Sequence, residues 1–129
     1  MHIGSCFCGS VTYEVRGNIG PAYYCHCSRC RKISGSAFSS NAVVDVADFF
    51  ITRGEDLLKA TRSESGVARV FCSACGSSLF VRQENQMRLR LGTLDTPLAE
   101  GPAFHIYTNS KANWFALCDD LPQHEESVG

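Results

Sequence analysis

The chain has 129 residues, which is enough for one domain with a modest hydrophobic core. Its 44% hydrophobic and 19% charged residues exclude bulk disorder. A net charge of -1 at pH 7 excludes the basic surface typical of proteins that bind nucleic acid or anionic membranes, and no apolar run approaches the roughly 20 residues that span a bilayer.

Short β-strands dominate the pattern along the chain. Residues 10–16 alternate, with Val11, Tyr13 and Val15 on one face, as in a half-buried strand. Composition and flanking turn signals predict further strands at residues 37–46, 57–62, 67–71, 78–82, 87–91, 104–108 and 114–118. The predicted fold class is mainly β, with antiparallel sheets, and Trp114 and Phe115 are expected in its core.

Two hairpins are expected within this series. Ser63-Glu64-Ser65-Gly66 has the composition of a turn between two strands, and residues 84–86 form the second turn. Alternation after the second turn predicts an inward set and an outward set, namely Met87, Leu89 and Leu91 inward and Arg88 and Arg90 outward.

Helix signals are weak and amount to one turn after Cys27 and one near residues 45–50. Residues 92–102 contain two prolines and two glycines and are predicted to form a loop. We expect residues 1–122 to form a single domain and residues 123–129 to form a flexible, polar C-terminal tail.

Cysteine spacing is the most specific signal, because seven of the eight cysteines fall into three tight groups. Cysteines separated by a single residue cannot easily form a disulfide with each other. Residues 1–6 have neither a basic start nor an apolar stretch, so the sequence carries no export signal and predicts a cytoplasmic, reducing location. Zinc binding is therefore favoured over a disulfide framework.

The outer two groups are expected to form one closed zinc site. Cys72-x-x-Cys75-Gly76 has the spacing of a zinc knuckle, and its trailing glycine permits the backbone angle that such a turn requires. This pair needs two more ligands, which Cys6-x-Cys8-Gly9 supplies. We assign Cys6, Cys8, Cys72 and Cys75 to a structural zinc that joins the N-terminus to the middle of the chain.

The middle group leaves a second zinc with an open position. Cys25, Cys27 and Cys30 lie within six residues, so one loop can supply three corners of a tetrahedron. A divalent cation with three thiolates carries about one negative charge, which Arg29, Arg31 and Lys32 can offset unless they are only a solvated face. Such a site suits a small anionic ligand that carries a thiol.

Three side chains could instead close the second site as a fourth ligand: Cys118, His26 and His105. A lone cysteine such as Cys118 is usually a small buried hydrophobe. In an extended segment, His26 would point away from the metal and be a surface group or a neighbour of the ligands. His105 alternates with Phe104 and Ile106 and is expected on the less buried face of its strand.

The ordered motifs C-x-C-G, C-H-C-x-x-C and F-C-x-x-C-G resemble those of the glutathione-dependent formaldehyde-activating enzyme family, whose relatives include animal centromere protein V. The resemblance extends from Cys6 to about Pro122 and includes four further segments, at residues 34–38, 92–95, 105–107 and 110–114. It implies a β-tent fold and the same two zinc sites, with the zinc at Cys25, Cys27 and Cys30 as the catalytic one.

The resemblance further implies a carbon–sulfur lyase that joins glutathione and formaldehyde as S-hydroxymethylglutathione. Arg29, Arg31 or Lys32 would hold a carboxylate of the thiol substrate, and Trp114 is a further candidate substrate-binding residue. Two other functions remain open: a non-catalytic zinc module with both metals structural, and a thiol-based redox or zinc sensor.

Overall fold

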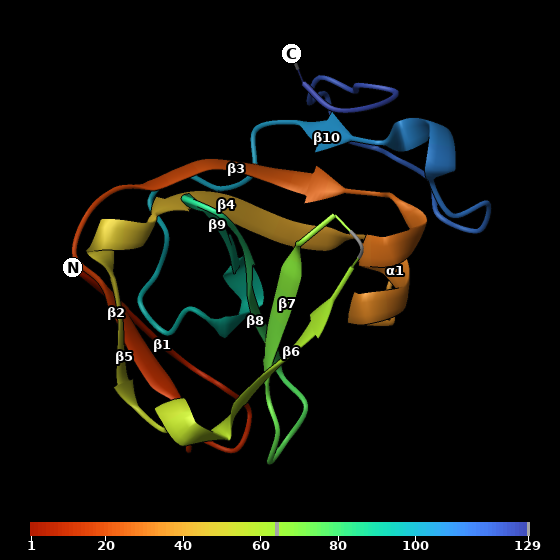
Figure 1. Cartoon of the computed structure of the whole chain (residues 1–129). Helices are drawn as coiled ribbons and strands as arrows, with labels where there is room; N and C mark the ends of the chain where they lie inside the picture. Colours follow the sequence, from red (N-terminus) through yellow and green to blue (C-terminus); the bar gives the residue numbers. More distant parts are fainter. Residues whose placement is uncertain (64, 129) are drawn as a thin grey trace.

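Ten strands in two sheets form the framework of the computed structural model, which describes residues 1–63 and 65–128 (Figure 1). The described strands are β1 (His2–Ser5), β2 (Thr12–Val15), β3 (Ile19–Cys25), β4 (Ser39–Asp45), β5 (Phe49–Arg53), β6 (Leu58–Arg62), β7 (Ala68–Cys72), β8 (Ser78–Gln83), β9 (Gln86–Arg90) and β10 (His105–Ile106). One α-helix, α1 (Ser28–Ser34), and four short 3-10 turns are also described, at Val46–Asp48, Glu55–Leu57, Leu91–Thr93 and Thr108–Ser110. The mainly β prediction is confirmed.

The strands form a three-stranded sheet in the order β1-β2-β5 and a seven-stranded sheet in the order β10-β3-β4-β9-β8-β7-β6. Every described pairing between these strands is antiparallel except that of β10 with β3. In Figure 1 the small sheet lies opposite β7 and β8, while β3 and β4 bridge the top, so the larger sheet curves around the interior.

The core fills the space between the two sheets. Val11, Tyr13 and Val15 are buried, as their alternation predicts, and belong to one apolar cluster with residues of β4, β8 and β9. Cys6 and Cys72 belong to the same cluster. One group of the cysteines is therefore continuous with the hydrophobic core rather than attached to its surface.

Both predicted hairpins are present. β6 pairs with β7, and β8 pairs with β9. Gly66 adopts a positive φ of 82° in the first turn, whereas Glu64 of that turn lies outside the described residues. Met87 and Leu89 are buried as predicted, and Leu91 is half-buried where the strand gives way to a 3-10 turn.

Arg90 lies on the outward face of β9, as predicted, but it is not accessible to solvent as an outward residue would be. It is only 8% exposed. Its side chain lies on the face of β9 opposite the core, but Asn41 stands across from it on β4 and residues of α1 cover that face. Alternation predicts which face a residue occupies, but it cannot predict that a helix will cover the outer face.

Strands β1, β3 and β5 were not predicted from the sequence. The helical turn expected near residues 45–50 is the 3-10 turn Val46–Asp48, and β5 begins directly after it. The strand predicted at residues 114–118 is not formed, and Trp114 is 69% exposed rather than in the core. Cys118 is exposed, whereas His105 is buried, so both of these burial predictions are wrong. Tyr107, with a φ of 56°, starts a 3-10 turn that ends the β pattern after β10.

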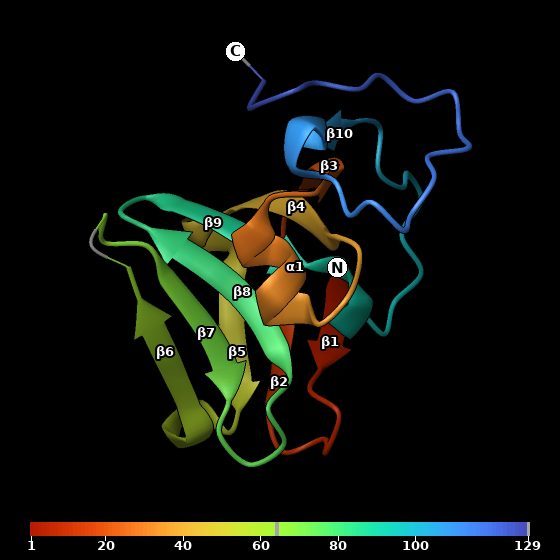
Figure 2. The ribbon, with the colours of Figure 1, turned by 90° about the vertical axis from the view of Figure 1, so that its right-hand side faces the viewer.

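The C-terminal segment makes backbone hydrogen bonds to β10 and the turn after it. His105 donates its N–H to Pro122 (2.9 Å), and His124 donates to His105 (2.9 Å). This segment, expected to be a flexible tail, therefore lies beside β10 on the side away from β3 (Figure 2). Among the described residues, no helix is long and apolar enough to cross a membrane.

Candidate metal centres

Four sulfur atoms converge where the N-terminal turn meets the turn between β7 and β8. The Sγ atoms of Cys6, Cys8, Cys72 and Cys75 all lie within 4.8 Å of one another. Cys6 Sγ is 3.6 Å from Cys8 Sγ, and Cys8 Sγ is 4.0 Å from Cys72 Sγ. A tetrahedral zinc with Zn–S bonds of about 2.3 Å places its ligand sulfurs about 3.8 Å apart. This four-cysteine cluster therefore has the dimensions of a closed zinc site.

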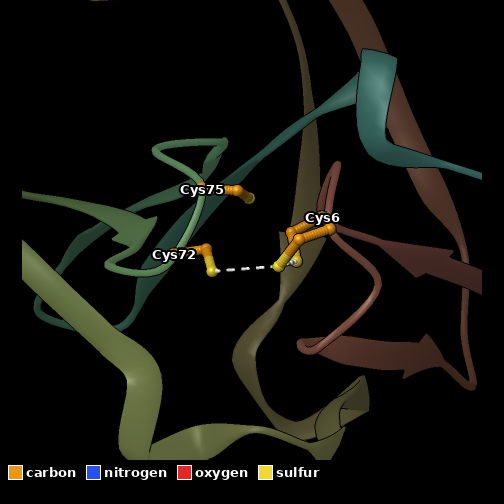
Figure 3. Close-up of side chains that lie close together, drawn as sticks. Cys6, Cys72 and Cys75 are labelled. Carbon is orange, nitrogen blue, oxygen red and sulfur yellow. Dashed lines mark hydrogen bonds between the residues drawn. The ribbon is translucent and has the colours of Figure 1, made fainter.

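The two turns that carry these cysteines depend on glycine. Gly9 follows Cys8 with a φ of 78°, and Gly76 follows Cys75 with a φ of 83°, a region that disfavours other residues. Gly76 donates its N–H to the carbonyl of Cys72 (2.7 Å) and so closes the second turn. Figure 3 shows Cys72 and Cys75 on this turn facing Cys6 on the other.

Two thiols of the four-cysteine cluster have pKa values that are shifted in opposite directions. Hydrogen bonds to Ser77 lower the pKa of Cys75 to about 5, whereas burial raises the pKa of Cys72 to about 11. Val11 donates its N–H to Cys6 Sγ (3.3 Å). A divalent cation would favour the thiolate form of all four ligands, and amide donors would share the resulting negative charge.

The second group of cysteines lies where β3 passes into α1. Cys25 ends β3, Cys27 caps the N-terminus of α1 and Cys30 lies in its first turn. Their Sγ atoms lie within 4.8 Å of one another, and Cys30 donates its N–H to Cys27 Sγ (3.4 Å). Hydrogen bonds from the other two thiols lower the pKa of Cys27, and the same contacts raise that of Cys25.

This three-cysteine cluster gains no fourth ligand from residues 1–63 or 65–128. Neither Cys118, His26 nor His105 joins the group of converging ligand atoms. Both clusters could hold a metal ion, and their donors fit zinc, but only the four-cysteine cluster supplies a complete tetrahedron.

Behind the three-cysteine cluster, two histidines and an aspartate form a hydrogen-bonded chain. His26 Nε2 lies 2.8 Å from His105 Nδ1, and His105 Nε2 lies 3.0 Å from a carboxylate oxygen of Asp119. In the neutral His105 ring, the proton lies on Nε2 beside the carboxylate, and Nδ1 then accepts the hydrogen bond from His26. Burial lowers the pKa of His26 to about 4, so this ring is neutral. These hydrogen bonds connect the loop that carries Cys25 and Cys27 to His105 of β10 and to Asp119 in the C-terminal segment.

Sequence reasoning did not find this chain, although one weak signal was available. His26 stands between two predicted ligands, and His105 stands between two apolar residues. His26 was expected to be a surface group or a neighbour of the ligands, and His105 was expected on the less buried face of its strand. Instead, β10 pairs with β3 so that His105 stands beside Tyr24, next to the cysteine loop. Only the parallel pairing, which spans about 80 residues of sequence, brings the two rings together.

Replacing His105 with alanine should lower the melting temperature by several degrees. The substitution leaves the buried Nε2–H of His26 without its acceptor, which costs about 1–3 kcal/mol, and it removes the ring that stacks on Tyr24. His124→Ala is the matched control, because among the described residues the ring nitrogens of His124 make no hydrogen bond. Thermal unfolding of both variants, followed by circular dichroism, measures the difference. Equal melting temperatures in the two variants would contradict a stabilising role of the hydrogen bonds that join His26, His105 and Asp119.

The predicted cationic residues lie on α1. Arg29 and Lys32 are exposed, while Arg31 is half-buried. Arg29, Lys32 and Ile33 line a groove of about 260 Å³ together with Thr61, Arg62, Ser63 and Arg69 of the β6–β7 hairpin. Trp114 lines none of the cavities described for residues 1–63 and 65–128, and its ring packs edge-on against Phe115. The structure thus places Arg29 and Lys32 on one groove, on the helix that also carries Cys30, and leaves Trp114 at the surface.

Comparisons with known proteins show which family the sequence resembles. The model of the family described as "Glutathione-dependent formaldehyde-activating enzyme" matches residues 1–110. An Aspergillus flavus protein named "Putative glutathione-dependent formaldehyde-activating enzyme" is 28% identical over 111 residues, which cover 84% of this chain and 53% of that protein. A protein of the same name from Penicillium rubens is 34% identical over 87 residues, covering 66% of this chain and 46% of its own length.

The chain spans about half the length of these curated relatives. Among solved structures, the crystal structure of a Rhodobacter sphaeroides protein superposes with a TM-score of 0.63 at 22% identity. That match covers 78% of this chain and 97% of the other. At this level of identity, the structural likeness supports a shared fold.

Proposed function

The chain belongs to the glutathione-dependent formaldehyde-activating enzyme family, and from this premise we propose that it is a zinc-dependent carbon–sulfur lyase. It would be related to S-(hydroxymethyl)glutathione synthase and act on glutathione or on another small-thiol adduct. The observation that carries this proposal is the three-cysteine cluster, which has no fourth ligand from the described residues. A site of three protein ligands leaves one position for a substrate.

We propose two zinc ions per chain. Cys6, Cys8, Cys72 and Cys75 would hold a structural ion, and Cys25, Cys27 and Cys30 would hold the catalytic one. When bound in the second site, zinc stabilises a thiolate and polarises an oxygen ligand.

In the proposed reaction, the sulfur of the thiol bonds to the carbonyl carbon of formaldehyde, and the thiol proton ends on the former carbonyl oxygen. The reverse reaction breaks the same carbon–sulfur bond. Arg29, Arg31 and Lys32 would attract and orient the carboxylates of the thiol, because each is a cation on the helix that carries Cys30. The exposed ring of Trp114 would contact the substrate only if the substrate extends beyond α1.

The family and the composition also support proposals on the fold, the domain bounds, the location and the partner of the protein. We propose that the sheets form a β-tent, that residues 1–122 constitute a single domain with residues 123–129 as its tail, and that the protein works in the cytoplasm. Its partner would be a small thiol rather than a nucleic acid or a membrane, in keeping with the net charge of -1.

Cobalt substitution tests the function directly. The absorption bands of cobalt in the three-cysteine cluster should shift when glutathione is added, because a thiolate would enter the fourth position. A parallel assay should detect S-hydroxymethylglutathione formed from glutathione and formaldehyde above the uncatalysed rate. Cobalt bands that stay unchanged across a range of thiols would rule out direct sulfur ligation.

A second candidate is a non-catalytic zinc module in which both ions are structural. It is favoured by one observation: Cys25 is buried, and its cluster ties β3 to α1. Mild chelation separates the two candidates. Removal of the second ion without unfolding supports the lyase, whereas unfolding that accompanies the loss of either ion supports the module.

A further inference from the structure

A cavity of about 290 Å³ lies between α1 and the outer face of the larger sheet. Ile33 and Ser34 line it from α1, and Arg90 lines it from β9. Exposed residues at its edge, Gly76 and Gly92 among them, connect it to solvent. The cavity is thus reachable from outside and shares a helix with the three-cysteine cluster.

Arg90 brings an uncompensated positive charge to this cavity. Its guanidinium is charged at any physiological pH, yet the residue is only 8% exposed. Its hydrogen-bond partners are neutral: Nη1 donates to Asn41 Oδ1 (2.7 Å), and Nε donates to Ser78 Oγ (3.2 Å). Over residues 1–63 and 65–128, no carboxylate forms an ion pair with Arg90, and Nη2 has no hydrogen-bond acceptor.

Hydroxyl groups complete the lining on the same side. Ser78 Oγ accepts from Arg90, and Ser39 Oγ accepts from Asn41 Nδ2 (2.8 Å). Because both hydroxyls are used as acceptors, each keeps its own O–H for another group. Among residues 1–63 and 65–128, no acidic side chain lines the cavity. Free donors around a buried cation are the environment that an oxyanion requires.

We propose that this cavity binds a carboxylate of a small ligand, with Arg90 as the charged partner and Ser39 and Ser78 as hydroxyl donors. A buried charge without a counter-charge is unfavourable, and the ligand would supply the missing negative charge. The anion site follows from the geometry around Arg90. The choice of a carboxylate on a thiol substrate rests on the proposed function.

One other role for Arg90 has to be separated from this one. A divalent cation with four thiolates carries about two negative charges, and Gly76 of that cluster's second turn also lines the cavity. Arg90 would then only balance the charge of the four-cysteine cluster at a distance. In that case, loss of Arg90 should weaken metal retention and leave anion binding unchanged.

The test is a titration of the metal-loaded, ¹⁵N-labelled protein with S-methylglutathione, which has carboxylates but no free thiol, and separately with inorganic phosphate. We expect saturable shifts of the backbone amides of Ser40, Ser78 and Gly92. Arg90→Gln should weaken the binding of S-methylglutathione at least about tenfold, the loss expected for a buried charged hydrogen bond. Arg88→Gln, on the same face of β9 but outside the cavity, should change it less than about twofold.

Four results would overturn the proposal: no saturable shift with S-methylglutathione, shifts confined to the groove of Arg29 and Lys32, unchanged affinity in Arg90→Gln, or a loss of metal in Arg90→Gln without a loss of anion binding. Binding of phosphate alone would reject the carboxylate assignment. The titration of the wild-type protein tests the proposal even if Arg90→Gln does not fold. A protein that binds S-methylglutathione at Arg90 but lacks lyase activity would contradict the proposed function and leave this inference intact.

Discussion

Replacing Cys75 with alanine is expected to leave the domain largely unfolded. The four-cysteine cluster is continuous with the core, because Cys6 and Cys72 are members of the main apolar cluster and Cys75 packs against it. Structural zinc contributes about 10–16 kcal/mol to the folding of small zinc-dependent domains, which matches or exceeds the total stability of about 5–15 kcal/mol of an ordinary domain. Circular dichroism, thermal unfolding and the metal content of protein purified under reducing conditions would measure the effect.

Cys118→Ala is the matched control for this experiment. Cys118 is exposed and belongs to neither cluster, so its loss should change neither the metal content nor the melting temperature. A Cys75→Ala protein that melts within about 2–3 °C of wild type would mean that the cluster adds less than about 1 kcal/mol, since such a shift corresponds to that range in a domain of this size. The structural assignment would then fail.

Local sequence patterns predicted the parts of the site that depend on near neighbours. Cys25, Cys27 and Cys30 stand within six residues, so one β-strand end and one helical turn suffice to bring them together. The turn at Cys75-Gly76 was predictable because a positive φ after the second cysteine favours glycine. Cys6 and Cys8 were predictable partners of this turn, because a tetrahedral zinc site needs four ligands and the turn supplies only two.

Tertiary contacts decided the features that the sequence did not predict. Arg90 alternates correctly on β9, yet α1 covers its face of the sheet, so a residue expected in solvent lines a cavity. His105 is buried because β10 pairs with β3, a contact between segments about 80 residues apart. No periodicity within β10 contains that information, because the strand has only two residues.

Replacing Cys27 with alanine should remove the proposed second metal ion and the proposed lyase activity while the domain stays folded. None of the residues of α1 is buried, so loosening the helix does not open the core. Cys27 also caps α1 by accepting the N–H of Cys30, and loss of a cap costs about 1 kcal/mol. We therefore expect one metal ion per chain instead of two, a melting temperature a few degrees lower, and no shift of the cobalt bands with glutathione.

Cys27→Ser separates the role of Cys27 as a metal ligand from its role as the N-cap of α1. Serine is a strong N-cap residue but a poor zinc ligand, so this variant should regain the melting temperature lost in Cys27→Ala and still lack the second ion and the activity. Recovery of activity in Cys27→Ser would show that the cap, rather than the thiolate, is what the reaction needs. Equal destabilisation by Cys27→Ala and Cys75→Ala would instead mean that both clusters are structural, because only a cluster that supports the core unfolds the domain when one of its ligands is lost.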